Sequence, residues 1–538
     1  MKHIFFTLSI LFSAFVAIAQ PPNIQWAKCY GGSKQDIAKC VRQTTDGGYI
    51  IVGNTTSSDS EVSVHHGTFQ PDIWVVKTDN TGAISWTKVF GGSGSDNATC
   101  VRQTKDGGYI VVGGTNSTDG DITGVHSGAG GDMLVLKLDA SGNISWQKCL
   151  GGSGNEYAWA VRQTKDDGYV VTGFTASNDG DVSGTHNDST GVLSQDVWVV
   201  KLNDTGGITW QKPLGGTGVE TGYAVQQTTD GGYMVAGITN SDDGDVTKRY
   251  GNSNDAWLIK LDNTGSLNWQ KSLGGTGVDG FTAVTQTTDG GYIACGLTLS
   301  NDNDVAGNHL DSTSTPTSDV WVVKTDNAGS ISWQRCYGGS GSDEGSDVQQ
   351  TTDGGYVVAA TAASNDGNVK GIHIISGAVE DDFWVLQLFS GGDISWQKCL
   401  GGSYNDHANS IQQTADDGYV VAGYTSSVSG DVSHNNGQED FWAVKLDKPA
   451  AVNNVNATTH LICICPNPSQ SNFTVQYHLS ADAALEVADV AGRVITTIPL
   501  HKGTTQTTIN AATWQPGMYF YKVMQNDSML ESGKLVKE

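Results

Sequence analysis

Short apolar runs rich in valine, isoleucine, tyrosine and tryptophan recur along the chain, separated by stretches of glycine, aspartate, asparagine, serine and threonine. Four kinds of run follow one another in a constant order, with examples at residues 98–104, 108–113, 196–201 and 144–148. Runs of this composition are typical of β-strands, and the Asp-Gly-Gly sequence between the first two kinds indicates a hairpin. The third kind reads Asp-x-Trp-Val-Val-Lys, and an Asp-x-x-Gly turn joins it to the fourth, Ile-Ser-Trp-Gln-Lys. The pattern predicts units of four short antiparallel strands.

This unit occurs seven times. The string Gln-Thr-x-Asp-(Gly/Asp)-Gly-Tyr returns every 59 to 64 residues, and its tyrosines are Tyr49, Tyr109, Tyr169, Tyr233, Tyr292, Tyr356 and Tyr419. A fixed period of this size marks a repeat architecture. Four antiparallel strands per repeat are typical of one blade of a β-propeller, and such rings have four to eight blades. A solenoid is the alternative, but tight hairpins favour a closed ring.

The phase of the repeat predicts how the ring closes. A fourth-kind run at residues 24–30 precedes the first repeat, and none follows the last third-kind run at 440–447. We therefore expect residues 24–30 to pair antiparallel with 440–445, which removes an exposed sheet edge. Thirteen of the fifteen tryptophans lie in the third and fourth runs, and we expect these to be wedges between blades rather than a ligand-stacking cage. The predicted fold class is all-β: a seven-bladed β-propeller closed by an N-terminal strand.

The N-terminus indicates export. Lys2, the apolar run over 4–18 and small residues before Gln20 predict a signal peptide over residues 1–19. No later apolar run approaches the ~20 residues that a spanning helix needs. We expect the mature protein to begin near Gln20, without a lipid anchor because no cysteine follows the cleavage site.

Charge and cysteine usage exclude other classes of protein. The formal net charge of −26, from 56 acidic and 30 basic residues, argues against a nucleic-acid partner. Four of the nine cysteines share one repeat position, and the odd total leaves at least one thiol unpaired. We expect small packing sites rather than a disulfide framework, with Cys463 and Cys465 the only pair worth testing.

Alternate loops of an antiparallel blade share a face, so the long loops and the Gly-Gly-Ser connections between blades lie together. Long loops inside a compact fold are more often functional than tight turns, so a ligand is expected there. One acidic residue per repeat stands on that face, and these seven are the candidate ligand-binding residues: Asp36, Asp96, Glu156, Glu220, Asp279, Asp343 and Asp406. The alternative is that each carboxylate caps a turn by accepting backbone N–H bonds.

The long loops also carry Asp-Gly-Asp or related sequences, which resemble fragments of calcium loops. The candidate calcium ligands are Asp119, Asp121, Asp179, Asp181, Asp243, Asp245, Asp302 and Asp304. None of these loops completes the twelve-residue pattern with its terminal glutamate. We predict no other cofactor. No nucleophile elbow, zinc-protease helix or phosphate loop is present, so no catalytic residue is predicted and we expect a protein that is not an enzyme.

The run Gly-Gly-Ser-Gly-x-Asp-x-Ala followed by Asp-Gly-Gly-Tyr-Ile-Val-x-Gly-x-Thr resembles bacterial β-propeller repeats with a period near sixty, found in exported proteins of gliding and related Bacteroidetes-type bacteria. The resemblance covers residues 24–447. Residues 448–460 are expected to be a linker, and strand signals at 473–477, 485–490, 493–498, 506–509 and 518–523 predict a small immunoglobulin-like β-sandwich over 461–538.

The landmarks of this second module appear in order: Pro-Asn-Pro-Ser at 466–469, Asp-Val-Ala-Gly-Arg at 489–493, Pro-Gly-Met-Tyr at 516–519 and Gly-Lys-Leu-Val at 533–536. They resemble the type A sorting domain of the type IX secretion system. The resemblance implies passage through the periplasm and the outer membrane, recognition by the secretion machinery, and a product that is attached to the cell surface or released.

These inferences predict a secreted or surface-attached propeller, a monomer, that acts as a binding or adhesion module for an unknown protein or glycan. The alternative is a secreted carbohydrate-active enzyme or lectin that uses the long-loop face. Paired carboxylates abound, so composition leaves a glycosidase pair open.

Overall fold

The computed structural model describes residues 20–449 and 462–537, apart from residues 68, 127, 129, 188–190, 192–193, 311–314, 376–377, 466–468, 470, 478, 480, 491, 504–505 and 526–527. The predicted signal peptide, nearly all of the predicted linker and the Pro-Asn-Pro opening of the second module lie outside the described residues. The chain divides into two compact units, Met1–Pro449 and Ala450–Glu538, which are described separately.

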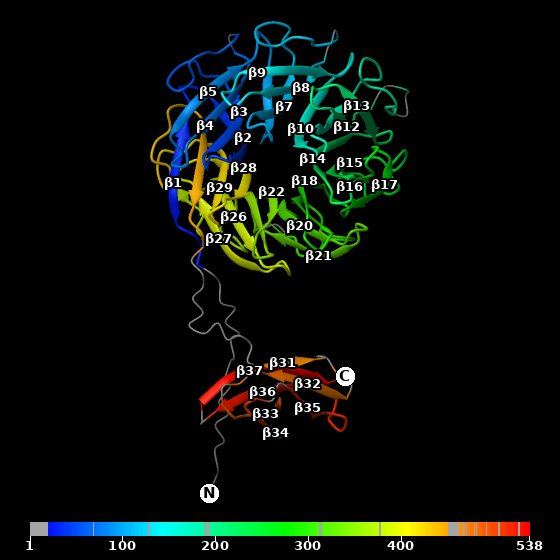
Figure 1. Cartoon of the computed structure of the whole chain (residues 1–538), viewed down its shortest axis with the longest axis vertical. Helices are drawn as coiled ribbons and strands as arrows, with labels where there is room; N and C mark the ends of the chain where they lie inside the picture. Colours follow the sequence, from blue (N-terminus) through cyan, green and yellow to red (C-terminus); the bar gives the residue numbers. More distant parts are fainter. Residues whose placement is uncertain are drawn as a thin grey trace. The chain divides into compact units, whose positions relative to one another are not determined.

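The first unit is a ring of seven four-stranded antiparallel sheets (Figure 1). Six of the sheets each take their four strands consecutively from one repeat.

The strands of these six blades are given in order from the channel outward. Blade 1 consists of β2 (Asp36–Gln43), β3 (Tyr49–Thr55), β4 (Asp72–Thr78) and β5 (Ile84–Phe90). Blade 2 consists of β6 (Asp96–Gln103), β7 (Tyr109–Thr115), β8 (Asp132–Leu138) and β9 (Ile144–Leu150). Blade 3 consists of β10 (Glu156–Gln163), β11 (Tyr169–Thr175), β12 (Asp196–Leu202) and β13 (Ile208–Leu214). Blade 4 consists of β14 (Glu220–Gln227), β15 (Tyr233–Thr239), β16 (Asp255–Leu261) and β17 (Leu267–Leu273). Blade 5 consists of β18 (Asp279–Gln286), β19 (Tyr292–Thr298), β20 (Asp319–Thr325) and β21 (Ile331–Tyr337). Blade 6 consists of β22 (Asp343–Gln350), β23 (Tyr356–Ala362), β26 (Asp382–Leu388) and β27 (Ile394–Leu400).

Blade 7 combines the two ends of the repeat region. It contains β28 (Asp406–Gln413), β29 (Tyr419–Thr425) and β30 (Asp440–Leu446), and its outer strand is β1 (Ile24–Tyr30). β1 and β30 are antiparallel, with Ala27 opposite Val444 and Tyr30 opposite Phe441. The predicted fold class and the predicted closing strand are confirmed.

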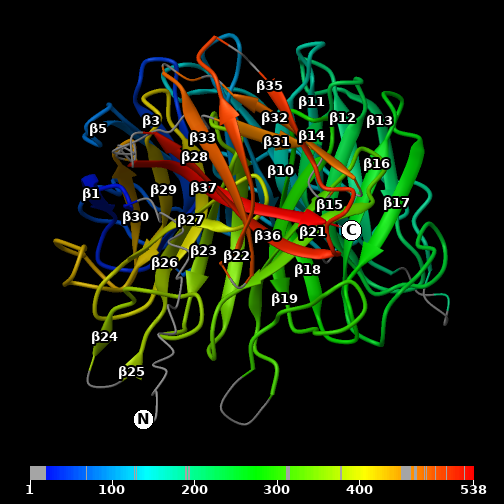
Figure 2. The same ribbon diagram turned by 90° about the horizontal axis from the view of Figure 1, so that it is seen from below.

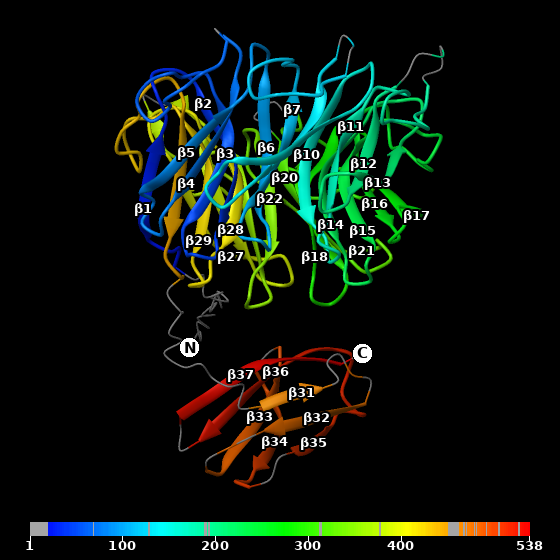
Figure 3. The ribbon, with the colours of Figure 1, turned by 45° about the horizontal axis from the view of Figure 1, so that its top comes forward.

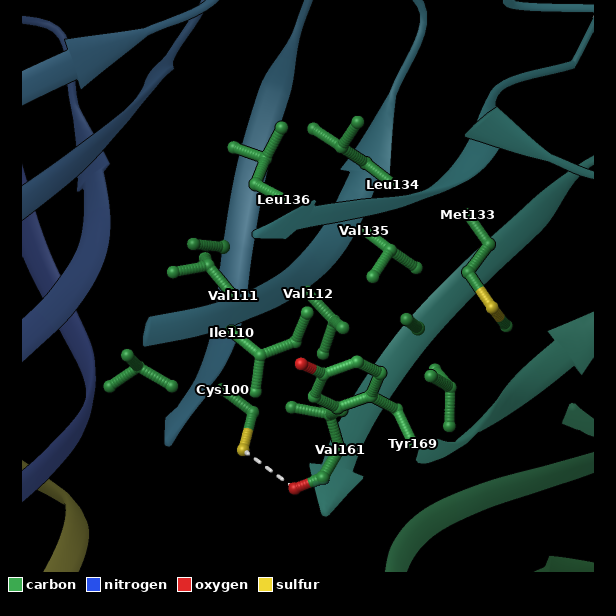
Figure 4. Packing of buried hydrophobic residues seen from close by; sticks show 14 of the residues in the cluster. Cys100, Ile110, Val111, Val112, Met133, Leu134, Val135, Leu136, Val161 and Tyr169 are labelled. Carbon is green, nitrogen blue, oxygen red and sulfur yellow. Dashed lines mark hydrogen bonds between the residues drawn. The ribbon is translucent and has the colours of Figure 1, made fainter. Parts of the chain in front are cut away.

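The middle strands of each blade are apolar without alternation because both of their faces are covered. All seven residues of β8 are buried, as are all seven of β7 between its neighbours in the sheet. Figure 4 shows side chains of blades 2 and 3 packing together, with the Cys100 thiol directed at the carbonyl oxygen of Val161. Neighbouring blades thus share a continuous core, which explains why these strands lack the period of two seen in half-exposed sheets.

The fourth-run tryptophans lie between blades, as predicted. Each one meets the tyrosine of the next blade at 5.4 to 6.1 Å between ring centroids, as Trp86 meets Tyr109. The glycine of the following Asp-x-x-Gly turn covers the same ring. At Gly142, with φ +81°, an added Cβ would lie 2.7 Å from Trp86. A side chain there would displace the wedge, so the turn requires glycine.

The Asp-(Gly/Asp)-Gly turn has a similar backbone requirement. Its middle residue has positive φ, +83° at Gly47 and Gly107. Two repeats place aspartate there, and Asp167 and Asp417 adopt φ +64° and +62°. Aspartate tolerates this left-handed conformation better than most residues, which explains the Gly/Asp choice in the repeat string.

Blade 6 has an elaborated long loop. A two-residue hairpin, β24 (Ile374–Ile375) and β25 (Ala378–Val379), is inserted between β23 and β26. Figure 2 shows it beyond the ends of these strands, on the face where the loops between second and third strands lie.

The second unit is a sandwich of two sheets (Figure 3). One sheet has the order β31 (Ile462–Cys465), β32 (Asn472–Tyr477) and β35 (Gln506–Asn510). The other has the order β34 (Val494–Leu500), β33 (Ala483–Asp489), β36 (Gly517–Gln525) and β37 (Ser528–Lys537). Phe473, Leu485, Val523 and Leu535 belong to its own buried core.

Two strands of the sandwich were not predicted from the sequence. β31 is four residues long, and β37 is interrupted by Gly533 and charged residues, so neither shows a clear apolar alternation. Pairing with β32 and β36 makes them strands. The side chains of Cys463 and Cys465 lie outside the described residues, so the expectation that the cysteines form no disulfide framework stays a prediction for this pair.

Candidate functional site

The seven predicted ligand-face acids are inside the protein, where they cap the Gly-Gly-Ser connections. Each is at most 1% exposed: Asp36, Asp96, Glu156, Glu220, Asp279, Asp343 and Asp406. Each accepts a hydrogen bond from the backbone N–H of the connection's second glycine, as Asp36 does from Gly32 at 2.7 Å. Asp36 also accepts hydrogen bonds from the Thr55 and Ser57 hydroxyls. These contacts match the turn-capping alternative, and they leave the carboxylates covered from a ligand on that face.

The predicted calcium ligands tie the long loops to the same connections. Asp119, Asp179, Asp243 and Asp302 each accept a backbone N–H from the Ser or Thr after the glycine pair, at 2.7 to 2.8 Å. Asp181, Asp245 and Asp304 accept the N–H of the first glycine at 3.3 to 3.4 Å, and Asp121 lies 3.6 Å from His66 Nε2. Among the described residues, no group of three or more His, Cys, Asp or Glu side chains could hold a metal ion. Calcium binding by these loops stays a prediction.

The ring differs from blade to blade where it lines the central channel. The innermost strand of every blade contains a β-bulge, a register shift after its third residue, as between Ala158 and Ala160 of β10. A bulge re-aims the extra residue, and bulges are frequent next to functional sites. We call the seven bulged residues the mouth ring: Lys39, Thr99, Trp159, Tyr223, Thr282, Ser346 and Asn409. All seven line the channel.

Four members of the mouth ring bond to the neighbouring blade. Thr99, Thr282, Ser346 and Asn409 each donate a side-chain hydrogen bond to a backbone carbonyl of the next innermost strand, at 2.6 to 2.9 Å. Lys39, Trp159 and Tyr223 make no such bond among the described residues. Trp159 Nε1 is buried without an acceptor there. These three large side chains are therefore the members available to a ligand.

Trp159 and Tyr223 form an aromatic wall of the channel mouth. Their rings meet edge-on at 5.1 Å, and the Tyr157 ring contacts Trp159 at 5.0 Å between centroids. Across the mouth lie Glu344 and His407, the second residues of β22 and β28, next to the long loops. The mouth encloses about 310 Å³, within the lower range of small-ligand sites. It opens on the long-loop face, where the sequence predicted a ligand.

A second ring lies three residues further along the innermost strands. We call it the arginine ring, and its members are Arg42, Arg102, Arg162, Gln226, Thr285, Gln349 and Gln412. A space of about 110 Å³ reaches it from the mouth ring. Arg42 forms an ion pair with Asp347 at 3.2 Å and donates to the Ser410 hydroxyl at 2.7 Å.

Two thiols of neighbouring blades contact the arginine ring. The neighbouring Cys100 thiol lowers the pKa of Cys40, and Arg42 acts in the same direction. The same contact raises the pKa of Cys100, so the pair releases one proton at most near neutral pH. Burial raises the pKa of Asp347, and Arg42 opposes that shift.

Sequence reasoning missed both rings because it compared the columns that repeat. The signal lay in the positions whose residue type changes from repeat to repeat. Two tryptophans, Trp159 and Trp514, lie outside the third and fourth runs, and Trp514 belongs to the second unit, so Trp159 is the exceptional tryptophan of the propeller. The side chains at these positions point into the channel because of the bulge, and no residue type in the repeat predicts that bulge.

A comparison with known protein families identifies the second unit. Residues 463–538 match the family described as the secretion system C-terminal sorting domain. No curated protein matches the chain. Similar solved structures include BamB from Moraxella catarrhalis, with 13% identity and a TM-score of 0.37, covering 79% of this chain and 99% of that chain. The Pan2 WD40 domain from Neurospora crassa has 10% identity and a TM-score of 0.40, covering 78% and 90%. A protein of unknown function from Bacteroides caccae has 11% identity and a TM-score of 0.32, covering 63% and 92%.

At these identities and TM-scores the solved structures carry no argument about function. The strand order defines the first unit as a seven-bladed β-propeller, and the second is a sorting domain. The protein is exported by type IX secretion to the cell surface or the medium, and the sorting domain implies contact with that machinery. No helix among the described residues has the length and apolarity to cross a membrane.

Proposed function

We propose that this protein is an exported binding module rather than an enzyme, and that its ligand enters the central channel through the mouth ring. The observation that carries the proposal is a difference between the members of that ring. Four members donate hydrogen bonds to neighbouring blades, while Lys39, Trp159 and Tyr223 line the mouth and make no such bond among the described residues.

The ligand proposed for this mouth is a sugar ring. Aromatic side chains supply large apolar area at low entropic cost. Trp159 and Tyr223 offer such area at one side of the mouth, opposite the polar Glu344 and His407. This arrangement supports glycan binding over protein adhesion, because the mouth is concave and small.

The test is a glycan and peptide array probed with the purified protein and with Trp159→Thr. Threonine occupies the same ring position at Thr99 and Thr282, so the fold already accepts it. We expect Trp159→Thr to weaken binding at least ten-fold, about 1.4 kcal/mol. The control is Tyr404→Ala, which removes an aromatic side chain that is 56% exposed outside the channel and should leave binding unchanged. Absence of any array ligand, or equal binding by Trp159→Thr, would contradict the proposal.

The alternative is a carbohydrate-active enzyme. Glu344 lines the mouth, whereas the other two carboxylates of β22 are occupied: Asp343 is buried in the turn that it caps, and Asp347 is ion-paired with Arg42. Glycoside hydrolysis needs two carboxyl groups in separate acid and base or nucleophile roles. Release of reducing sugar from a bound oligosaccharide, lost in Glu344→Gln, would replace the binding module by the enzyme.

A further inference from the structure

The arginine ring concentrates positive charge inside an acidic protein. Three consecutive blades supply Arg42, Arg102 and Arg162, while the chain as a whole has a formal charge of −26. The other four blades place glutamine or threonine at this position. At this repeat position, the basic residues are therefore confined to one side of the channel.

The neutral members of the column join adjacent blades. Thr285 donates to Val348 O at 3.0 Å and Gln349 donates to Ile411 O at 3.0 Å, both on the next blade. Gln226 and Gln412 accept backbone N–H groups of neighbouring blades at 2.8 and 2.7 Å. These bonds join adjacent blades across the channel wall.

Arg102 and Arg162 have no acidic partner among the described residues. Each donates to the carbonyl of the preceding residue on its own strand, at 3.2 and 3.0 Å. Arg102 also lies 3.7 Å from the Cys40 sulfur. Of the three guanidinium groups, Arg42 is paired with Asp347. Even with a thiolate at Cys40, the ring keeps one uncompensated positive charge, which is centred on Arg162.

An uncompensated buried cation is costly unless it meets a counter-charge. Guanidinium groups are suited to oxyanions, because their N–H donors match carboxylate and sulfate oxygens in pairs. The channel leads from the aromatic wall of the mouth to these donors. Lys39, in the mouth ring, adds a cation on the way.

We propose that the channel binds an acidic sugar, with the ring against Trp159 and Tyr223 and the carboxylate or sulfate directed toward Arg162 and Arg102. This inference deepens the proposed function and rests on it for the location of the sugar ring. The charge of −26 repels polyanions at long range, so the ligand is a short acidic saccharide and not a nucleic acid.

The first arm of the test uses inorganic sulfate. Thermal unfolding is followed with sodium sulfate and with sodium chloride at equal ionic strength, so that screening is matched. A ligand that binds the folded state raises the melting temperature by mass action. We expect a saturable rise with sulfate for the wild-type protein, and for Arg162→Gln only the unsaturating rise that sulfate gives to folded proteins in general. Glutamine stands at this position in blades 4, 6 and 7, so the variant should fold.

The second arm uses two sugars that differ at one group. Methyl β-D-glucuronide carries a carboxylate where methyl β-D-glucoside carries a hydroxymethyl group, and binding is measured by titration calorimetry. We expect the glucuronide to bind at least ten-fold more tightly, and Arg102→Gln/Arg162→Gln to remove that preference. The control is Arg335→Gln, an arginine on the outer strand of blade 5, which removes one positive charge away from the channel, as each of the two substitutions does inside it.

The outcomes separate this inference from the proposed function. Equal binding of both sugars, weakened by Trp159→Thr, would leave the binding module standing and overturn the acidic ligand. Saturable sulfate stabilisation that survives in Arg162→Gln, or no saturable stabilisation in the wild type, would also overturn it. Saturable sulfate stabilisation lost in Arg162→Gln, with no sugar bound, would overturn the sugar-binding function and the acidic sugar alike.

Discussion

At the scale of single residues, the third-strand lysines act with the turn aspartates. In six blades a lysine that is at most 5% exposed pairs with the aspartate of the Asp-(Gly/Asp)-Gly turn, as Lys137 does with Asp106 at 2.8 Å. Burial of Asp106 is outweighed by hydrogen bonds, with that from Lys137 first, which lower its pKa to about 2. Blade 6 has Gln387 instead, donating to Asp353 at 3.0 Å.

This natural difference provides a matched pair of variants. Asp106→Ala leaves the buried Lys137 ammonium with Leu138 O as its acceptor among the described residues, so we expect the free energy of unfolding to fall by about 1–3 kcal/mol. Asp353→Ala removes the same turn bonds but leaves only the Gln387 amide, and no buried charge, without its acceptor. The free energy of unfolding should therefore fall by about 1 kcal/mol less than in Asp106→Ala. The measurement is the urea midpoint of each variant at an unchanged m-value. Equal costs would show that the turn bonds, and not the buried charge, carry the effect.

Buried carboxylates also set the pH dependence. Burial raises the pKa of Asp196 and Asp343 to about 6 and that of Asp255, Asp406 and Asp440 to about 7. Between pH 4 and 7 the folded protein therefore binds more protons than the unfolded chain. Stability falls as pH rises through that window, by linkage. The lowered pKa of Cys40 acts in the opposite direction, but it is one group against the five carboxyl groups whose pKa is raised.

We expect the free energy of unfolding to be at least about 2 kcal/mol lower at pH 8 than at pH 5. The variant is Asp440→Asn, which keeps an acceptor for the N–H of Asn436 and removes the charge that faces Asp36. It should be more stable than wild type at pH 8 and show a smaller pH dependence, measured by denaturant unfolding at both pH values. A wild-type stability that rises from pH 5 to pH 8 would contradict the assignment.

At the scale of elements, the decisive pairing is between β1 and β30. Without β1, blade 7 would end at the open edge of β30, and exposed edges promote association with other chains. β1 also carries Trp26, the wedge against Tyr49 of blade 1, and Tyr30, whose hydroxyl donates to Gly82 O at 2.7 Å. One strand therefore completes a sheet and fills a blade interface.

Deleting residues 20–30 should destabilise the propeller by several kcal/mol, because a strand and the aromatic side chains of Trp26 and Tyr30 are lost together. We expect a lower melting temperature and a dimer or larger species on size-exclusion chromatography. A synthetic peptide of residues 21–31, added in excess, should restore the melting temperature by pairing with β30. A peptide with Ala27→Pro is the control, since proline removes a backbone donor. An unchanged melting temperature after the deletion would contradict the closing role.

At the scale of the whole molecule, the two units have separate tasks. Each has its own sheets and its own buried core, and the sorting function belongs to residues 463–538. The ring is closed by its own N-terminal strand, so it needs no strand from the second unit.

Truncation after Asp447 should leave a folded propeller that accumulates in the periplasm. We expect its melting temperature to match that of the propeller transition in the full chain, because no blade loses a strand. Fractionation of the producing bacterium, compared with the full chain, is the second measurement. Normal export of the truncated protein would contradict the sorting role, and an unfolded product would contradict the domain boundary.

Repetition in the sequence determined the architecture of this protein. Seven copies of one string, with the fourth strand offset by one copy, predicted the blade, the ring and the closing strand, because a repeated hydrophobic pattern can be buried only against its own neighbours. The motifs after residue 461 likewise identified the sorting domain. Local signals suffice where a structure is built from local hairpins.

The tertiary structure alone decided where the functional residues lie. The acids that repeat were predicted to face a ligand, yet folding buries Asp36 and its counterparts under the turns they cap. A one-residue bulge turns Trp159 and Tyr223 into the channel, and ring closure brings Arg42 of blade 1 to Asp347 of blade 6, 305 residues away. Such a contact depends on the summed geometry of seven blades, which no window of the sequence contains.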